Sequence, residues 1–194
     1  MAAIGRVLAS RLAENGQNLI IVERNRERLN VLAGELSNRH NVRVRVLVQD
    51  LSLPDAAQAL LDGCSGFPIS RLINNAGFEV PLGPFQSSKA QAITAMLQVN
   101  IVALTELTRL FLPQIIAHGG SIINVASHAA FQPVPYMSAY VASKSFDSTL
   151  ARPYTPSLLS RIRKRSRWWL CVPEPRRRSS GSVLERKSKA PGSV

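Results

Sequence analysis

Tyr140, Lys144 and Ser127 form the most informative pattern in this sequence of 194 residues. Tyr140 and Lys144 are four residues apart, so on a helix their side chains lie one turn above each other. A neighbouring cation favours the phenolate, and a tyrosine that normally ionises at about pH 10 then exchanges protons closer to neutrality. Ser127 follows the β-like run 121–125, where a strand-end hydroxyl can hydrogen-bond a substrate oxygen. These three groups suit carbonyl reduction or alcohol oxidation.

A Tyr-x-x-x-Lys pair alone is a weak signal, because such pairs arise by chance in many helices. Further segments precede it in a definite order: Asp50-Leu51 closes an alternating strand, Asn74-Asn-Ala-Gly77 ends an apolar run, and Asn100 lies in an apolar helical stretch. Together with the serine, the tyrosine and the lysine, the set resembles the short-chain dehydrogenase/reductase family over about the first 150 residues.

The resemblance implies an NAD(P)-dependent oxidoreductase that transfers hydride between nicotinamide and a carbonyl or alcohol carbon. It implies Tyr140 as the acid/base and Lys144 as its activating neighbour and a ligand of the cofactor ribose. It implies Ser127 as the donor to the substrate oxygen and Asn100 as a water-holding link in a proton relay. The alternative reading is an inactive remnant that retains these four residues.

The resemblance also implies a cofactor site. Its residues would be Ile4, Gly5, Arg24, Asp50, Leu51, Asn75, Ala76, Gly77, Tyr140 and Lys144. Arg24 stands where an arginine faces the 2′-phosphate of NADP, while the preceding Glu23 speaks for NAD, so NADP is favoured only slightly. The three histidines are scattered without metal-ligand spacing, and we predict no metal.

Helical and strand-like spacings alternate through residues 1–150 and predict an α/β fold with a doubly wound, Rossmann-like parallel sheet. The expected strands cover 18–22, 42–48, 72–74 and 121–125. A pattern like a capping box at Ser52–Asp55 predicts a helix running toward Leu61. Pro113 is expected to kink the long helical region 90–117.

The fold is predicted to be incomplete at its start. Ala3, Ile4 and Gly5 look like the end of the family's Thr-Gly-x-x-x-Gly-Ile-Gly turn, so the first strand and first glycine are expected to be missing. That strand would lie between the strands at Asn18 and Leu72. Its loss would leave unpaired backbone groups on both, so weak cofactor binding and marginal folding are expected.

Residues 151–194 differ sharply from the predicted domain at 1–150. They carry 12 Lys and Arg against 2 acidic residues, a net of +10 out of the whole-chain +12. Charge, proline and serine dominate without a regular period, and such composition predicts a disordered basic tail. A reading-frame shift near 150–153 is our hypothesis for its origin. Binding of nucleic acid or an anionic surface through Arg161–Trp169 is the less favoured alternative.

The remaining features bound the environment and partners. Cys64 and Cys171 form no disulfide framework, which favours a reducing cytoplasm. No apolar run approaches the roughly 20 residues of a membrane span, and the N-terminus lacks the apolar segment of a secretory signal. The expected partner is a small carbonyl or alcohol substrate, and the resemblance implies that the parent protein is a homo-oligomer.

Overall fold

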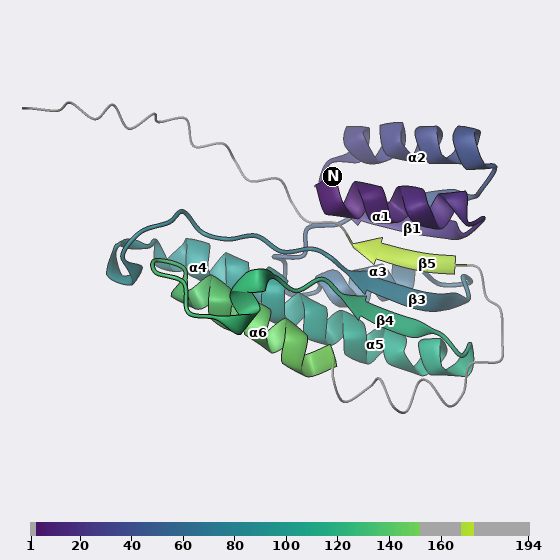
Figure 1. Ribbon diagram of the computed structural model, residues 1–194. Coiled ribbons are helices and arrows are strands. Elements are labelled where there is room, and N and C mark those ends of the chain that lie inside the picture. Colours follow the sequence, from purple (N-terminus) through teal and green to yellow (C-terminus); the bar gives the residue numbers. More distant parts are fainter. Residues whose placement is uncertain (1–2, 152–167, 173–194) are drawn as a thin grey trace, which may run out of the picture.

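The computed structural model describes residues 3–151 and 168–172, which form one parallel sheet with helices on both faces (Figure 1). The elements are α1 (Ala3–Glu14), β1 (Asn18–Glu23), α2 (Arg26–His40), β2 (Val44–Val48), α3 (Ala56–Gly63), β3 (Ile69–Asn74), η1 (Phe85–Ser87), α4 (Ala90–Leu97), η2 (Gln98–Ala103), α5 (Leu104–Ala117), β4 (Ser121–Asn124), η3 (His128–Phe131), α6 (Ser138–Ala151) and β5 (Trp168–Val172). The predicted doubly wound α/β fold is confirmed.

The two faces of the sheet bury separate apolar clusters. On one face, α1 and α2 cover Leu19 and Ile21 of β1, and on the other, α3 and α5 cover Ile20 and Val22. Successive residues of a strand point to opposite faces, so a strand covered on both sides needs an unbroken apolar run. This explains why β1 is apolar from Leu19 to Val22, and why β2 at the sheet edge alternates with arginine.

The sheet order is β2-β1-β5-β3-β4, and every pair of neighbours is parallel. β5 therefore occupies the place between β1 and β3 where the sequence predicted a missing strand (Figure 1). Ile20 of β1 and Leu72 of β3 both align with Leu170. The expected unpaired edges of β1 and β3 are thus paired over the length of β5.

The prediction of a structureless tail is consequently wrong for Trp168–Val172. Trp and Val favour strands, and backbone pairing with β1 on one side and β3 on the other stabilises this segment as a strand. The other tail residues, 152–167 and 173–194, lie outside the described part of the chain. The hypotheses of a shifted reading frame and of tail-mediated binding therefore stay predictions.

The long helical region has an irregular turn around Asn100, and the kink at Pro113 stays a prediction. Residues Gln98–Ala103 form a π-helical turn between α4 and α5, whereas α5 continues through Pro113 to Ala117. π-turns are uncommon and often mark functional positions, because they shift the register of the backbone hydrogen bonds. The irregularity places Asn100 inward, with no exposed surface.

The combined helix Ala90–Ala117 is long and apolar enough, by those two criteria, to cross a membrane. Its inner residues, including Met96, Leu107 and Phe111, are buried within the described structure. Core helices of globular proteins meet the same criteria, so this finding is weak evidence. The expectation of no membrane span stays a prediction.

The helix expected after Ser52 begins at Ala56, later than a capping box would place it. Both the backbone N–H and the hydroxyl of Ser52 donate to Asp50 Oδ1, at 2.9 and 2.7 Å. Asp55 occupies the N-cap position without a side-chain capping bond. The capping-box prediction is wrong because the serine is already bonded to the preceding aspartate.

Candidate functional site

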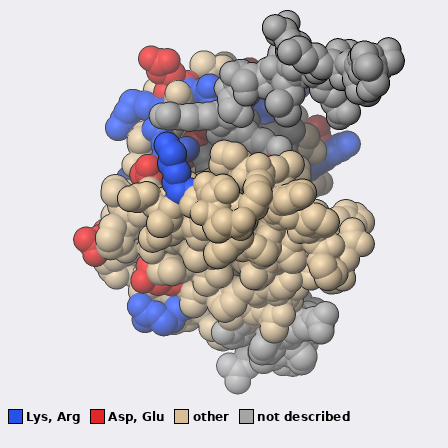
Figure 2. Space-filling view, turned by 90° about the vertical axis from the view of Figure 1, so that its left-hand side faces the viewer, with Lys and Arg blue, Asp and Glu red and all other residues tan. Residues whose placement is uncertain are grey.

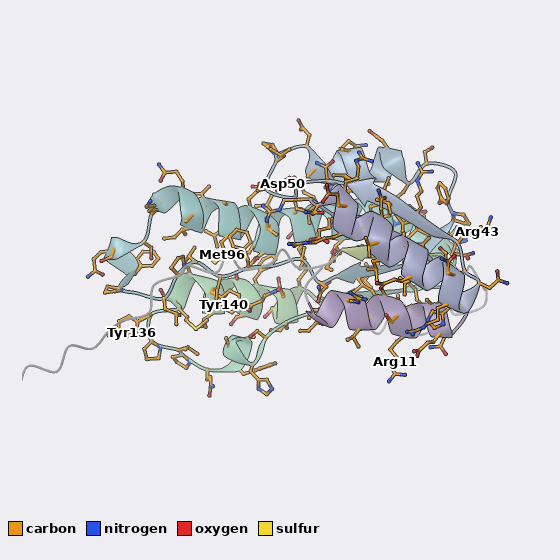
Figure 3. All side chains as sticks on the ribbon, turned by 90° about the horizontal axis from the view of Figure 1, so that it is seen from above. Arg11, Arg43, Asp50, Met96, Tyr136 and Tyr140 are labelled. Carbon is orange, nitrogen blue, oxygen red and sulfur yellow. The ribbon has the colours of Figure 1, made fainter. Side chains whose placement is uncertain are left out.

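The predicted site residues gather beyond the carboxyl ends of the parallel strands. Figure 3 shows Asp50 and Tyr140 at that end of the sheet, with Arg11 and Arg43 at the opposite end. Loops that leave the carboxyl ends of neighbouring strands converge there, and ligands of open α/β sheets bind in the crevice that they leave. The topology thus brings together residues that are far apart in the sequence.

A groove of about 580 Å³ brings five of these residues together. Its lining includes Ile4, Asn75, Ser127, Tyr140 and Lys144, which come from α1, the loop after β3, the end of β4 and α6. Three of the four residues of the expected tetrad share this groove. Asn100 lies behind it and is fully buried.

Lys144 lies at the back of the groove and is held from two sides. Its Nζ donates to the backbone oxygen of Val125 at 3.2 Å and to Asp147 Oδ2 at 2.9 Å. Tyr140 lies one turn earlier on the same helix and is half-buried. The predicted helical pairing of the phenol and the ammonium is therefore present, with an additional carboxylate that sequence reasoning missed.

Ser127 caps the short helix η3. Its Oγ accepts a hydrogen bond from the backbone N–H of Ala129 at 3.2 Å. Because a hydroxyl both accepts and donates, this bond orients the oxygen while its hydrogen stays available for a groove ligand. The geometry permits the predicted donation to a substrate oxygen.

The side chain of Asn100 is used to hold the loop after β3. Its Oδ1 accepts from Phe78 N–H at 3.1 Å, and its Nδ2 donates to Phe78 O and Ser143 Oγ, each at 3.0 Å. The buried amide is therefore satisfied by protein groups. The water-holding role stays a prediction, and these bonds show that the amide also holds the loop after β3 in place.

Asn75, Ala76 and Gly77 form a buried wall beside Lys144. Neither polar atom of the Asn75 side chain has a hydrogen-bond partner within the described residues, although the side chain is buried. A Cβ atom on Gly77 would meet Lys144 Nζ at 2.9 Å and Asn100 Oδ1 at 3.2 Å. A side chain at this position would therefore displace the Lys144 ammonium, and Asn75 lines a groove that can take a polar ligand.

Arg24, Asp50, Leu51 and Ala76 line a second, narrower cavity of about 80 Å³ next to β1. Arg24 Nη1 lies 3.6 Å from Asp50 Oδ2. Burial acts to raise the pKa of Asp50, but the hydrogen bonds from Ser52 and the Arg24 charge outweigh it, and the pKa is lowered. The carboxylate is therefore maintained as an anion that binds Ser52 and Arg24.

Ile4 and Gly5 both belong to the first turn of α1, which contacts β5. Ile4 is half-exposed and lines the groove, whereas Gly5 is buried. Backbone N–H groups in the first turn of a helix lack intrahelical partners and favour anions. The first turn of α1 thus lies at the same groove as Tyr140.

Asp50→Asn is expected to weaken folding in a pH-dependent way. A carboxyl whose pKa is lowered on folding stabilises the fold above its unfolded pKa of about 3.9, and loses this effect as pH falls through the folded value. The free energy of unfolding should be lower for Asp50→Asn than for the parent at pH 7. The difference should shrink below about pH 4. Urea titrations across this range measure it, and Asp62→Asn is the control; a pH-independent difference would contradict the assignment.

The parallel sheet and the groove define a nucleotide-binding α/β fold with a Ser, Tyr and Lys site. The sequence profile of the short chain dehydrogenase family matches residues 1–159, and the chain belongs to this family. Among curated relatives, the very-long-chain 3-oxoacyl-CoA reductase of Mus musculus is 30% identical over 147 residues. That match covers 74% of this chain and 47% of the relative, so the chain spans about half of its length.

Solved structures show the same fold. A short-chain dehydrogenase from Sphingobium yanoikuyae in complex with NADPH is 33% identical, with a TM-score of 0.74 over 81% of this chain and 62% of that chain. The bulky-bulky ketone specific alcohol dehydrogenase from Comamonas testosteroni is 31% identical, with a TM-score of 0.75 over 81% and 65% of the two chains. The recognised family and fold class are thus confirmed.

Proposed function

We propose that the chain acts as an NAD(P)-dependent oxidoreductase that transfers hydride between nicotinamide and a carbonyl or alcohol carbon. The observation that carries this proposal is the groove shared by Ser127, Tyr140 and Lys144. It provides a hydroxyl, a phenol and an ammonium on one wall, which is the set that proton transfer to a developing alkoxide requires.

The residues present fit a dinucleotide. The buried Asn75 amide, which has no hydrogen-bond partner within the described ranges, and the close approach at Gly77 support a polar ligand against this wall. Asp50, Leu51 and Ala76 would hold the adenine end, the first turn of α1 with Ile4 and Gly5 would face the phosphates, and Tyr140 and Lys144 would bind the ribose. When bound, the nicotinamide supplies or accepts the hydride.

Within the groove, each polar side chain has a separate task in our proposal. Ser127 donates to the carbonyl oxygen of the substrate and polarises it. Tyr140 gives its phenolic proton to that oxygen as negative charge develops there, and recovers it in the reverse direction. Lys144 stabilises the resulting phenolate, since a nearby cation favours the charged form.

An apolar substrate suits the surface around Tyr140. Figure 2 shows a broad uncharged face at the end of the molecule, with charged side chains at its border. A small pocket lined by Phe85, Ile93 and Met137 adjoins Tyr140, and Phe85 is exposed. The relative that reduces a very-long-chain 3-oxoacyl-CoA supports a ketone on an apolar chain as the substrate class.

Cofactor titration tests the proposal. We expect NADPH to bind the 194-residue chain more tightly than NADH, because Arg24 lies exposed beside Asp50 where a 2′-phosphate would sit. Arg24→Ala should weaken NADPH binding by about tenfold and leave NADH binding nearly unchanged, since a hydrogen bond to a charged group contributes about 1.5–3 kcal/mol. Fluorescence titration measures both; absence of binding for both cofactors would favour the inactive-remnant alternative.

Other expectations remain proposals of ours. The nucleotide-binding domain would comprise residues 1–150 together with Trp168–Val172. A reducing, cytoplasmic location agrees with the free thiol of Cys64, whose pKa burial raises to about 11. Within the described ranges no three His, Cys, Asp or Glu side chains gather to hold a metal. The homo-oligomer and the absence of a metal stay predictions.

A further inference from the structure

Beneath Tyr140 lies a buried ion pair. Lys144 and Asp147 are three residues apart on α6, and the exposed fractions of their side chains are 6% and 0%. Their charged atoms lie 2.9 Å apart. Solvent screens a buried pair much less than a surface pair, so the carboxylate strongly influences the ammonium and the groups around it.

Within the described residues, the Asp147 carboxylate interacts with Lys144 and with few other polar groups. Asp147 Oδ1 has no hydrogen-bond partner in the part of the chain that the structure describes, and Lys144 is the only described residue that forms an ion pair with Asp147. Burial raises the pKa of Asp147, and the Lys144 charge opposes part of that rise.

Few other ionisable groups lie on the elements around α6. His128 lies on η3, and Glu106 and Arg109 lie on α5, where Arg109 and Leu150 of α6 line one cavity. The segments α4, η2 and β4, which pack against α6, contain none. On α6 itself the remaining ionisable group is Tyr140. Glu79 and Tyr136 line the small pocket beside Tyr140. Because Asp147 itself contacts Lys144, a change at Asp147 should act first on Lys144.

We propose that Asp147 is a positioning residue that holds the Lys144 ammonium at the back of the groove and offsets part of its charge at Tyr140. The ammonium is confined between Asp147, Val125 O and the backbone of Gly77, where a Cβ would lie 2.9 Å from Nζ. The inference rests on the proposed roles of Tyr140 and Lys144. It adds a negative charge to the site, beside the ammonium that is proposed to activate the phenol.

The sign of the effect follows from the charges. Asp147→Asn preserves the shape of the side chain but removes its negative charge, so the net charge near Tyr140 becomes more positive. The ammonium keeps Val125 O and the open groove as partners, and we expect it to stay charged. A more positive environment favours the phenolate, so we expect the phenolate absorbance midpoint to lie at lower pH in Asp147→Asn than in the parent.

Phenolate absorbance measures this directly in the 194-residue chain. The parent and Asp147→Asn are each titrated with and without the additional change Tyr140→Phe, and the difference isolates Tyr140 from the other tyrosines. Circular dichroism at each pH limits the comparison to folded protein. Asp55→Asn, which removes an exposed carboxylate before α3, is the matched control and should leave the midpoint unchanged.

A lower midpoint in Asp147→Asn, with return toward the parent value in Asp147→Glu, is the expected result. An unchanged or higher midpoint overturns the proposal, because Asp147 would then serve packing alone or be needed to keep Lys144 charged. Asp147→Ser provides the same comparison if Asp147→Asn does not fold. The absorbance readout needs no turnover. A chain that shifts its midpoint without reducing any ketone would contradict the proposed function but support this inference.

Where turnover is measurable, the pH profile of kcat for NADPH-dependent ketone reduction offers a second readout. It should move to lower pH in Asp147→Asn in parallel with the absorbance midpoint. A loss of kcat at every pH, with both midpoints unchanged, would indicate a purely structural role and would also overturn the proposal.

Discussion

Leu170→Pro is expected to lower the free energy of unfolding by about 2–4 kcal/mol, a large part of the stability of a domain. β5 is paired on both sides, so each of its backbone N–H groups faces a neighbouring strand. Proline removes one such donor and leaves a buried acceptor unpaired, and for this reason it is excluded from central strands. Urea titration followed by circular dichroism measures the loss.

A matched substitution separates the strand from the remainder of the tail. Val183→Pro makes the same change outside the described residues, and we expect it to have little effect. A second arm uses a chain ending at residue 160 with a synthetic peptide of residues 165–172, which should restore part of the lost stability. Equal stability of the parent and Leu170→Pro would show that β5 does not contribute to the fold in solution.

Tyr140→Phe is expected to reduce the rate of ketone reduction by about 10²–10⁴-fold, the range of general acid–base contributions. The change removes only the phenolic oxygen and keeps the ring in the groove, so cofactor binding should persist. Lys144→Ala should also weaken cofactor binding, because Lys144 is proposed to bind the ribose. Steady-state kinetics with NADPH and an apolar ketone, together with cofactor titration, distinguishes the two variants.

Thr149→Ala is the control for this pair, since it removes an exposed hydroxyl from the same helix. It should retain the parent rate. Activity of Tyr140→Phe within a few-fold of the parent would rule out the phenol as the proton donor. Equal loss in Thr149→Ala would instead point to damage of the helix.

Most of the domain could be predicted from the sequence, because the spacing of apolar and polar residues in each segment matches the burial of that segment in the structure. β1 is apolar throughout and is buried on both faces, and the Tyr140 to Lys144 spacing matches one turn of α6. Ser127, placed by its position after a strand, also lies in the groove. In each case a short segment contains the information needed to place the residue.

β5 was missed because its place depends on partners far away in the sequence. Its five residues, bounded by Arg167 and Pro173, show no alternation of apolar and polar residues and cannot be separated from a chance apolar run. The surrounding charge favoured a structureless tail. These residues form a strand because they pair with β1 and β3. No feature of the local sequence signals that pairing.

The partner of Lys144 and the bonds of Asn100 were missed for different reasons. A Lys-x-x-Asp spacing on a helix signals a neighbouring pair, so the partner of Lys144 could have been found by the rule that identified Tyr140. The bonds from Asn100 to Phe78 could not, because they depend on the π-turn and on the path of the loop after β3. Neither feature has a recognised pattern in the sequence.

The position of β5 makes the centre of this sheet a site of competition. The space between β1 and β3 accommodates one parallel strand. In this chain the strand is β5, which follows α6 in the sequence, whereas the family's own first strand would precede α1. The two occupants exclude each other. A strand joined ahead of Ala3 would therefore compete with β5 for pairing with β1 and β3, and the relative strength of the two pairings would decide which end of the chain completes the fold.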